Sequence, residues 1–183
     1  MKLDRNTIVL LWGDHGFKLS DHGAWAKHSN AEIDIRTPLI IRAPGVTRAG
    51  TRTRALVEAT DIYPTLAELA GLTPPTTLEG LSKRPLFADP SRRWKSAAFA
   101  QYDRGTGDNA VGRLSGRTVR TTRYRYTAWL DRPGKTAARE LYDLDGDPEE
   151  SINIASNPTT AQVLAKVEAI RRGGWRLVRD SAQ

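Results

Sequence analysis

The sequence predicts an α/β fold in which part of a central sheet, with its helices, is followed by a small antiparallel sheet and a terminal helix. Three observations lead to this prediction. A continuous apolar run, Thr7–Trp12, ends at Gly13, as buried strands of helix-covered sheets do. After residue 95, short aromatic or β-branched segments alternate with turn residues. A segment with the helical spacing of apolar residues follows them.

The composition is that of a globular protein of ordinary size. The 183 residues are 39% hydrophobic and 27% charged, and they suit one domain or a large part of a bigger one. We expect two parts, residues 1–95 and 96–183. Near the start, the longest apolar run is too short to span a bilayer, so the sequence predicts no membrane protein. The lack of cysteine excludes disulfides, thiolate zinc sites and a cysteine nucleophile in this chain, and it leaves the compartment open.

In the first part, the elements are two strands and one helix. Thr7–Trp12 is expected to be buried on both faces, and Pro38–Arg42 is a second short buried strand. The helix spans Asp61–Ala70, where Asp61 can cap the start and Gly71 ends it. Its apolar stripe consists of Ile62, Leu66 and Leu69. The proline-rich segment after Gly71 is predicted to be a long connection.

In the second part, four short strands and a helix are expected. The strands are Ala97–Tyr102, Arg117–Thr122, Tyr124–Leu130 and Glu140–Leu144. In the third strand, Tyr124, Tyr126 and Ala128 alternate with Arg125, Thr127 and Trp129, which predicts one packed face and one wetter face. The final helix begins at Asn157–Pro158 and ends at Arg172, with Gly173 beyond it.

The net charge of +7 invites a polyanion as partner. Both halves of the chain carry a similar small excess of basic residues, so neither is a basic tail. One local asymmetry remains, because residues 113–125 hold five arginines and no acid, whereas residues 143–150 are rich in acids. Two solvated and facing surfaces explain this asymmetry, and a face that holds acidic glycans is the other interpretation. Nucleic acid is the less expected partner.

Titratable residues gather in one short window. All three histidines (His15, His22 and His28) fall there, together with Asp14 and Lys27. Asp14 and His15 follow the first strand, and ligands of open α/β sheets bind where strands end. A carboxylate and an imidazole can hold one cation between them. An aspartate that caps the next helix beside a surface histidine explains the pair equally well at this point.

Several motifs lie in one order along nearly the whole chain: Trp12–Gly16, Ser20–Asn30, Thr37–Ile41 with Ala43–Gly45, Thr60–Leu66 with Leu69–Leu72, and Glu140–Leu144 with Asp147–Glu149 and Asn153. Together they resemble type I sulfatases of the alkaline phosphatase-like superfamily. In that family a strand ends in an Asp-His or Asp-Asn metal pair, and a Gly-x-Trp-x-Lys element follows. The segments Ala98–Tyr102 and Tyr124–Trp129 are most similar to the iduronate-2-sulfatase branch.

The resemblance assigns roles to individual residues. Asp14 and His15 would be ligands of a divalent cation, which is calcium in sulfatases of this type. Lys27 would reach a sulfate oxygen and offset charge on the ester during S–O cleavage, whereas without the motif a solvated lysine is the default. His22 contacts the substrate or, as readily, bonds to the loop backbone. Trp25 is expected to pack rather than to stack on a substrate.

The chain also departs from the family pattern. Type I sulfatases carry a formylglycine nucleophile made from a Cys/Ser-x-Pro-x-Arg motif, and an Asp-Asp pair before it completes the metal site. This sequence contains neither. We therefore expect the C-terminal portion of a truncated, split or degenerate enzyme whose partner is the missing N-terminal portion, and which is inactive alone.

The predicted function is a sulfuric ester hydrolase that, in complete form, acts on sulfated sugars. A phosphodiesterase or phosphonate hydrolase of the same superfamily is the alternative, and a non-catalytic polyanion-binding module is another. The spacing of Trp25 and Lys27 favours sulfate. Two further expectations concern geometry. Lys27 should point its ammonium into the same pocket as Asp14 and His15. The strand pair Thr7–Trp12 and Pro38–Arg42 should leave an exposed apolar edge that promotes self-association.

Overall fold

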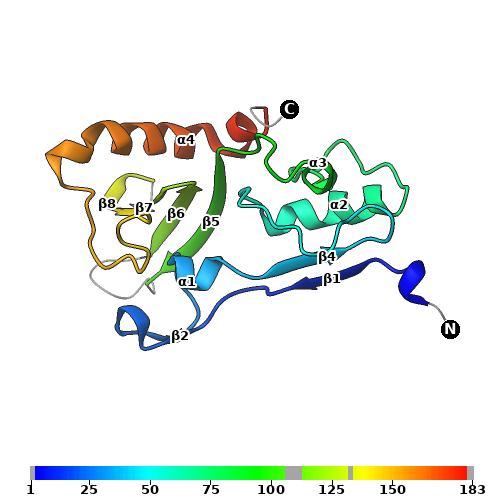
Figure 1. Cartoon of the computed structure of the whole chain (residues 1–183). Coiled ribbons are helices and arrows are strands. Elements are labelled where there is room, and N and C mark those ends of the chain that lie inside the picture. Colours follow the sequence, from blue (N-terminus) through cyan, green and yellow to red (C-terminus); the bar gives the residue numbers. More distant parts are fainter. Residues whose placement is uncertain (1–2, 106–112, 132–133, 181–183) are drawn as a thin grey trace.

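The protein has a four-stranded sheet beside a smaller strand pair with its own helices (Figure 1). The computed structural model describes residues 3–105, 113–131 and 134–180. Helix α4 covers one face of the large sheet, as Figure 1 shows, and segments from the first part of the chain cover the other. This arrangement confirms the predicted fold class of an α/β piece followed by an antiparallel sheet and a terminal helix.

The large sheet is antiparallel throughout, with neighbours in sequence order. The strand predicted at Tyr124–Leu130 has those bounds in the structure. The first strand ends two residues later than predicted, and the second and fourth begin three and four residues earlier and end one residue earlier. Extension follows from pairing, because each added residue finds a backbone partner on the neighbouring strand. The strands are β5 (Ala97–Arg104), β6 (Leu114–Thr121), β7 (Tyr124–Leu130) and β8 (Thr136–Asp143).

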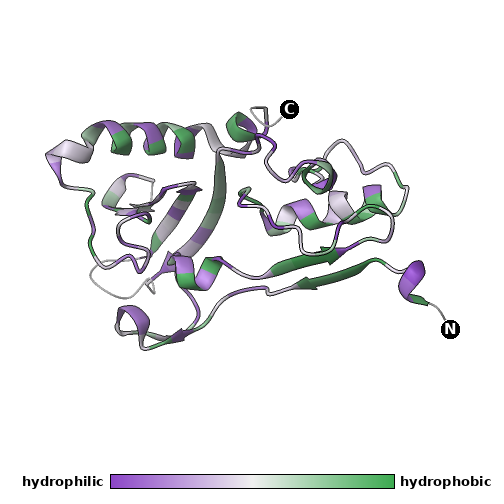
Figure 2. Ribbon diagram, viewed as in Figure 1, coloured by the Kyte–Doolittle hydropathy of each residue, from purple (hydrophilic) through white to green (hydrophobic). Residues whose placement is uncertain are grey.

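The apolar core lies between this sheet and α4 (Ala161–Asp180). Tyr126 and Ala128 of β7 are fully buried against Val167 of the helix, as the alternation predicted. Apolar and polar residues alternate along α4 in Figure 2, as in an amphipathic helix. Among the described residues, no helix combines the length and the hydrophobicity that crossing a membrane requires.

The start of the terminal helix is as predicted, and its end is not. The Asn157 side chain accepts a hydrogen bond from the Thr159 backbone N–H at 3.0 Å, and the 3₁₀ turn Pro158–Thr160 leads into α4. The predicted end at Arg172 is instead followed by a break, since Gly174 has φ 69° and the helix then resumes. Burial of Val178 against the sheet and a bond from the Arg179 guanidinium to Leu78 O, 2.7 Å, hold this last turn in place.

Both faces of β7 are buried, which corrects the prediction of a wetter face. Arg125, Thr127 and Trp129 are each at most 5% exposed. Helix α1 (Glu32–Ile35) and the residues before it lie on this face. A Cβ at Gly116 of β6 would lie 2.4 Å from the Asn30 Nδ2 that bonds to the Gly116 carbonyl, so only glycine permits this contact. The segment that covers this face of β7 is distant in sequence, so alternation within the strand does not predict that the face is buried.

The smaller sheet pairs β1 (Val9–Trp12) with β4 (Leu39–Arg42) in antiparallel register. Within the described residues it is not buried on both faces as the sequence predicted, because Leu11 and its partner Ile40 are 56% and 63% exposed. Figure 2 shows both strands as strongly apolar. The strand pair therefore exposes an apolar face, and self-association through an apolar edge stays a prediction.

The helix after β4 is shifted and differently capped. A 3₁₀ turn, Ala59–Asp61, precedes α2 (Ile62–Leu69), and the predicted stripe on α2 is only half-buried. Asp61 does not cap α2 with its side chain. It is fully buried and accepts bonds from the backbone N–H groups of Glu58 and Leu81 and from Lys95 Nζ, each at 2.8 Å. A short helix, α3 (Arg84–Ala88), interrupts the predicted long connection. The division at residue 95 stays a prediction.

Acid is expected to lower the free energy of unfolding of the protein by protonating Glu168 on α4. Bonds from Arg171, and then from Arg172 and Tyr126, lower the pKa of this carboxyl from 4.5 to about 2. Because the folded state lowers the pKa, the carboxylate stabilises the fold above pH 4.5, and this contribution is lost as the pH falls toward 2. The loss is about 2 kcal/mol after allowance for solvent screening. Urea unfolding of the unaltered chain and of Glu168→Gln between pH 6 and 2.5 measures it, and a constant difference between the two would contradict the assignment.

Candidate functional site

The polar cluster predicted after the first strand lies in a tight loop. β1 ends at Trp12, and Asp14 and His15 occupy the loop that follows. The loop lies against α1, where Gly16 N–H donates to Asp34 O at 2.8 Å. A Cβ at Gly16 would stand 1.7 Å from a backbone carbonyl of α1, so this close approach requires glycine. The approach fixes the direction in which His15 points.

His15 joins Asp14 and Lys27 into one cluster. His15 Nδ1 lies 2.7 Å from the carbonyl of Gly16, which can only accept, so Nδ1 carries the proton. The lone pair of Nε2 then accepts a bond from Lys27 Nζ at 2.7 Å, and Asp14 Oδ2 is 3.6 Å from the same nitrogen. Lys27 thus shares a cluster with His15, whereas neither Asp14 nor His15 is among the residues that line the basic pocket described below, so one shared pocket stays a prediction. Metal binding and sulfate binding by these residues stay predictions.

The donor pair is compatible with a cation but does not complete a site. Two atoms 3.6 Å apart can both reach a calcium ion at about 2.3–2.6 Å, and the carboxylate of Asp14 is largely exposed. Calcium takes about six to eight ligands. No group of three or more His, Asp or Glu residues able to hold a metal ion occurs in the part of the chain that the structure describes. Asp14 and His15 fit as two members of a larger ligand set.

A strained hairpin carries Lys27. Strands β2 (Lys18–Leu19) and β3 (Trp25–Ala26) pair across the 3₁₀ turn Asp21–Gly23. Four residues other than glycine in this region adopt left-handed φ angles, which cost about 1–3 kcal/mol each and cluster at functional segments. A buried ion pair of Lys18 with Asp34, to which Ser29 also donates, holds the hairpin to α1. The strained residues are Ser20, His22, Ala26 and His28.

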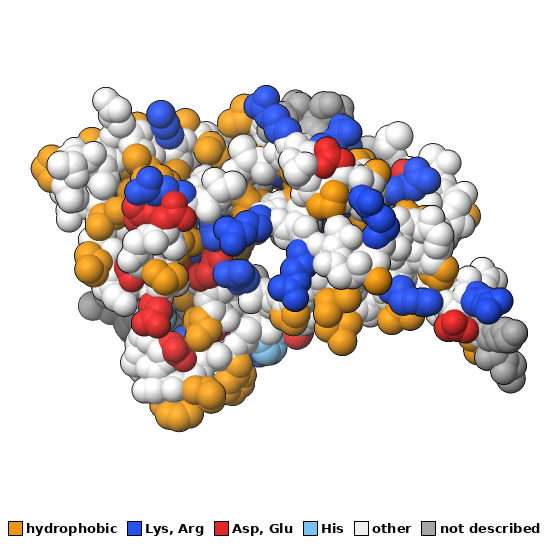
Figure 3. All heavy atoms as spheres, in the orientation of Figure 1, with side chains coloured by type: hydrophobic (Ala, Val, Ile, Leu, Met, Phe, Trp, Pro, Cys, Tyr) orange, Lys and Arg blue, Asp and Glu red, His pale blue; other side chains and the backbone are white. Residues whose placement is uncertain are grey.

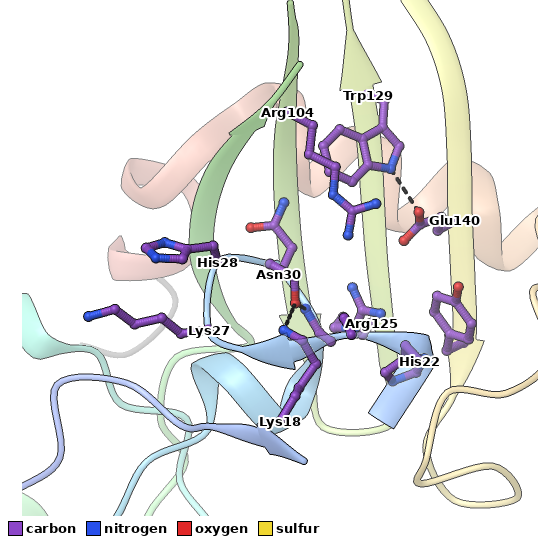
Figure 4. Close-up of a pocket in the computed structure, with 13 residues that line it drawn as sticks. Lys18, His22, Lys27, His28, Asn30, Arg104, Arg125, Trp129 and Glu140 are labelled. Carbon is purple, nitrogen blue, oxygen red and sulfur yellow. Dashed lines mark hydrogen bonds between the residues drawn. The ribbon is translucent and has the colours of Figure 1, made fainter. Parts of the chain in front are cut away.

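A basic pocket of about 240 Å³ lies between this hairpin and the large sheet (Figure 4). Four of its lining residues are cations and two are histidines, while Glu140 is the acid among them. Lys and Arg side chains are also spread over one face of the molecule, as Figure 3 shows, some of them around a gap near its middle. An environment of this kind favours an anionic ligand. The cations are Lys18, Lys27, Arg104 and Arg125, and the histidines are His22 and His28.

Two of these cations are neutralised by the fold and two are not. Lys18 is paired with Asp34 and Arg125 with Glu150, and all four side chains are at most 3% exposed. Among the described residues, neither Lys27 nor Arg104 has an acidic partner. Lys27 and Arg104 therefore supply the positive charge that is available to a ligand.

The arginine-rich stretch at residues 113–125 is mostly neutralised. Arg123 pairs with Asp143 and Asp145, which bears out the interpretation that the basic and acidic stretches face each other. Arg125 pairs with Glu150 of the same acidic stretch, and two other arginines have acidic partners elsewhere in the chain: Arg113 with Asp103 and Arg120 with Glu32. A continuous free basic face for polyanions is therefore not present in the described residues.

His22 and Trp25 are the other residues that the sequence analysis considered for the site. His22 lines the pocket, and its ring makes no hydrogen bond within the described ranges, so the alternative of a bond to the loop backbone is not seen. Trp25 does not pack as predicted, because it is 68% exposed on a two-residue strand with no layer outside it.

Most pocket residues were missed by sequence reasoning, among them one arginine, one tryptophan and one glutamate of the large sheet. Arg104, Trp129 and Glu140 come from three strands, and the pairing register places them on the face that the hairpin covers. Trp129 Nε1 donates to Glu140 at 2.9 Å, and the Arg104 guanidinium lies 4.8 Å from the Trp129 ring (Figure 4). Arg104 lies two residues after Tyr102, so the period of a strand places both side chains on one face of the sheet. The sequence does not show that this face lies beneath the histidine-rich window.

The chain is similar to sulfatases in sequence. A family profile described as N-sulphoglucosamine sulphohydrolase, C-terminal, matches residues 20–172. Iduronate 2-sulfatase of Mus musculus is 29% identical over 84% of this chain and 39% of its own length. A Delta 4,5-hexuronate-2-O-sulfatase of Bacteroides thetaiotaomicron is 31% identical over 91% of this chain and 34% of its own length. The chain thus spans little more than a third of these relatives.

Solved structures agree with the sequence matches. The protein BT4656, in complex with its substrate D-glucosamine-2-N,6-O-disulfate, superposes with a TM-score of 0.75 at 28% identity, over 93% of this chain and 35% of that one. A phosphonate monoester hydrolase of Agrobacterium radiobacter gives 0.74 at 26% identity, over 92% and 35%. Since the profile match extends over most of the sequence, the chain belongs to the sulfatase family, in the region that corresponds to the C-terminal part of N-sulphoglucosamine sulphohydrolase.

Proposed function

We propose that this chain forms one side of the active site of a sulfuric ester hydrolase that acts on sulfated sugars. The observation that carries the proposal is the position of the Lys27 ammonium. It lies 2.7 Å from His15 Nε2, beside Asp14 and at the wall of the basic pocket, with no acidic partner among the described residues. A sulfate ester that enters this pocket meets a cation that no carboxylate already satisfies.

Lys27 binds a sulfate oxygen and stabilises the charge that grows on the ester as the S–O bond breaks. An ammonium suits this role because it is a compact point charge with three donors. His22, which is exposed and lines the same pocket, contacts the substrate from the hairpin turn. Both residues belong to one hairpin, so they approach the ligand together.

Asp14 and His15 hold a divalent cation in this proposal, with calcium as the expected ion because the family resemblance implies it. Support comes from the 3.6 Å separation of their donor atoms and from the exposure of Asp14. A bound cation supplies positive charge next to the sulfate group. The lone pair of His15 Nε2 accepts the bond from Lys27 Nζ in this structure, so binding of the cation there requires Lys27 Nζ to move off His15 and toward the sulfate group.

Sulfated sugars are the proposed substrate class for two reasons. The relatives include a hexuronate sulfatase, and BT4656 is similar over nearly the whole chain while bound to a disulfated glucosamine. The pocket also combines cations with an aromatic ring and a carboxylate that can accept hydroxyl bonds, which is a common environment for sugars. The likeness to a phosphonate monoester hydrolase makes a phosphonate ester the competing substrate class.

Binding of a small sulfate ester tests the proposal. In calorimetric titrations with 4-nitrophenyl sulfate and calcium chloride, Lys27→Gln is expected to weaken binding at least about tenfold, because one charged hydrogen bond is lost. Lys166→Gln on the exposed surface of α4 is the matched control and is expected to change nothing. Asp14→Asn is expected to abolish the calcium dependence. Equal affinity of the Lys27→Gln and Lys166→Gln variants, or tighter binding of phenyl phosphonate than of the sulfate ester, would reject a sulfate site.

A further inference from the structure

A second unpaired cation lies across the pocket from Lys27. Both residues line the pocket, and Figure 4 shows Lys27 on the hairpin side, with its ammonium directed away from Arg104, and Arg104 on the side of the large sheet. Arg104 is the last residue of β5, so a strand of the large sheet positions it, whereas Lys27 depends on the hairpin. A volume of about 240 Å³ corresponds to roughly eight waters, which is enough for one sugar ring.

Arg104 is oriented by its neighbours. Its guanidinium carbon lies 4.8 Å from the centre of the Trp129 ring, and a cation above an indole face is attracted by the ring quadrupole. Trp129 is only 5% exposed, and its Nε1 is fixed by the bond to Glu140. The planar guanidinium is thereby held ready to bind a carboxylate or sulfate through two parallel hydrogen bonds.

Charge balance points to a ligand for Arg104. The two buried cations of the pocket, Lys18 and Arg125, are each matched by a buried acid. Glu140, the acid that lines the pocket, is bonded to Trp129 and lies on β8. Hence the pocket holds two cation centres from different elements, Lys27 and Arg104, that form no ion pair with a described carboxylate. The bond of Glu140 to the neutral indole leaves its negative charge in place, so the case for a ligand at Arg104 rests on its unpaired and oriented guanidinium.

We propose that Arg104 is a specificity-determining residue that binds a second anionic group, a carboxylate or a further sulfate, on the sulfated sugar. The Trp129 ring supports the guanidinium, and Glu140 accepts a hydroxyl bond from the same ring of the sugar. This inference rests on the proposed function, because it takes the first anion to be the sulfate ester at Lys27. It adds that the substrate carries two negative charges on or next to one sugar unit.

Calorimetric titration of the full chain with three ligands tests the inference. Glucose 6-sulfate carries one anion, glucosamine 2-N,6-O-disulfate carries two sulfates, and 2-O-sulfated glucuronic acid carries a sulfate and a carboxylate. The unaltered chain is expected to bind at least one of the two-anion ligands about tenfold or more tightly than glucose 6-sulfate. The two-anion ligand that binds more tightly identifies the second anionic group. Arg104→Gln is expected to remove this gain in affinity and to change the affinity for glucose 6-sulfate by less than about twofold.

Two variants separate recognition from general charge. Arg117→Gln removes an exposed arginine from the opposite face of the sheet, where its partner Ala128 contributes to the core beneath α4, and it is expected to leave all affinities unchanged. Arg104→Lys keeps the charge without the planar fork and is expected to lose most of the gain. Equal weakening of all three ligands by Arg104→Gln, or no gain from a second anion, overturns the inference. In the latter case, Lys27-dependent binding of glucose 6-sulfate would leave the proposed function intact, whereas no binding of any ligand would count against both.

Discussion

The 183-residue chain alone is expected to hydrolyse 4-nitrophenyl sulfate no faster than buffer does. The sequence contains no cysteine and no Ser-x-Pro-x-Arg motif, so it cannot supply the formylglycine nucleophile that the family resemblance implies. Loss of a catalytic nucleophile alone can cost about a millionfold in rate. Lys27, Asp14 and His15 would remain in the chain, but binding of sulfate and metal does not replace the missing nucleophile.

Release of 4-nitrophenol, followed by absorbance over hours with and without calcium, measures this expectation. The Lys27→Ala variant serves as the baseline, because any contaminating hydrolase is unaffected by it. Turnover by the unaltered chain above that baseline would mean that a nucleophile exists in this sequence and has been overlooked. Binding of the ester without turnover is the outcome that agrees with both the proposed site and the missing motif.

Glu150→Gln is expected to have the largest effect on stability. Its carboxylate pairs with Arg125 in the interior of the protein, where the two side chains are 1% and 3% exposed. Its other oxygen accepts the Glu32 backbone N–H at 2.9 Å and so fastens α1 to the large sheet. Removal of one partner leaves a buried charge uncompensated, which costs about 3–5 kcal/mol. For a chain of this size the melting temperature is expected to fall by about 10 °C.

Thermal unfolding followed by circular dichroism compares this variant with Glu149→Gln, whose side chain is the exposed neighbour and whose melting temperature is expected to stay within about 2 °C of the unaltered chain. Adding Arg125→Met to Glu150→Gln removes the unpaired charge and is expected to restore part of the loss. If Glu150→Gln melts like Glu149→Gln, the buried pair does not hold the two parts of the chain together.

The candidate site divides into residues that sequence reasoning reached and residues that it did not. Asp14, His15 and Lys27 were reached because a motif and a short window hold them, and the loop geometry at Gly16 brings them together. Arg104 and Trp129 were not, since 25 residues of sequence separate them and only the antiparallel register sets them side by side. The alternation of β7 predicted a solvent-exposed face for Trp129, whereas in the structure residues near Asn30 cover that face.

The sequence by itself determined the local features of this protein. The bounds of β7, the start of the terminal helix at Asn157 and the antiparallel character of the second part follow from side-chain alternation, capping and turn residues, which act within a few positions. Only the tertiary structure decided which faces are covered. Burial depends on segments far apart in the chain, as in the contact between Glu32 and Glu150, and no local pattern encodes where they meet. For the same reason β1, the most apolar strand in sequence, lies exposed here, while Arg125 lies buried with its acidic partner.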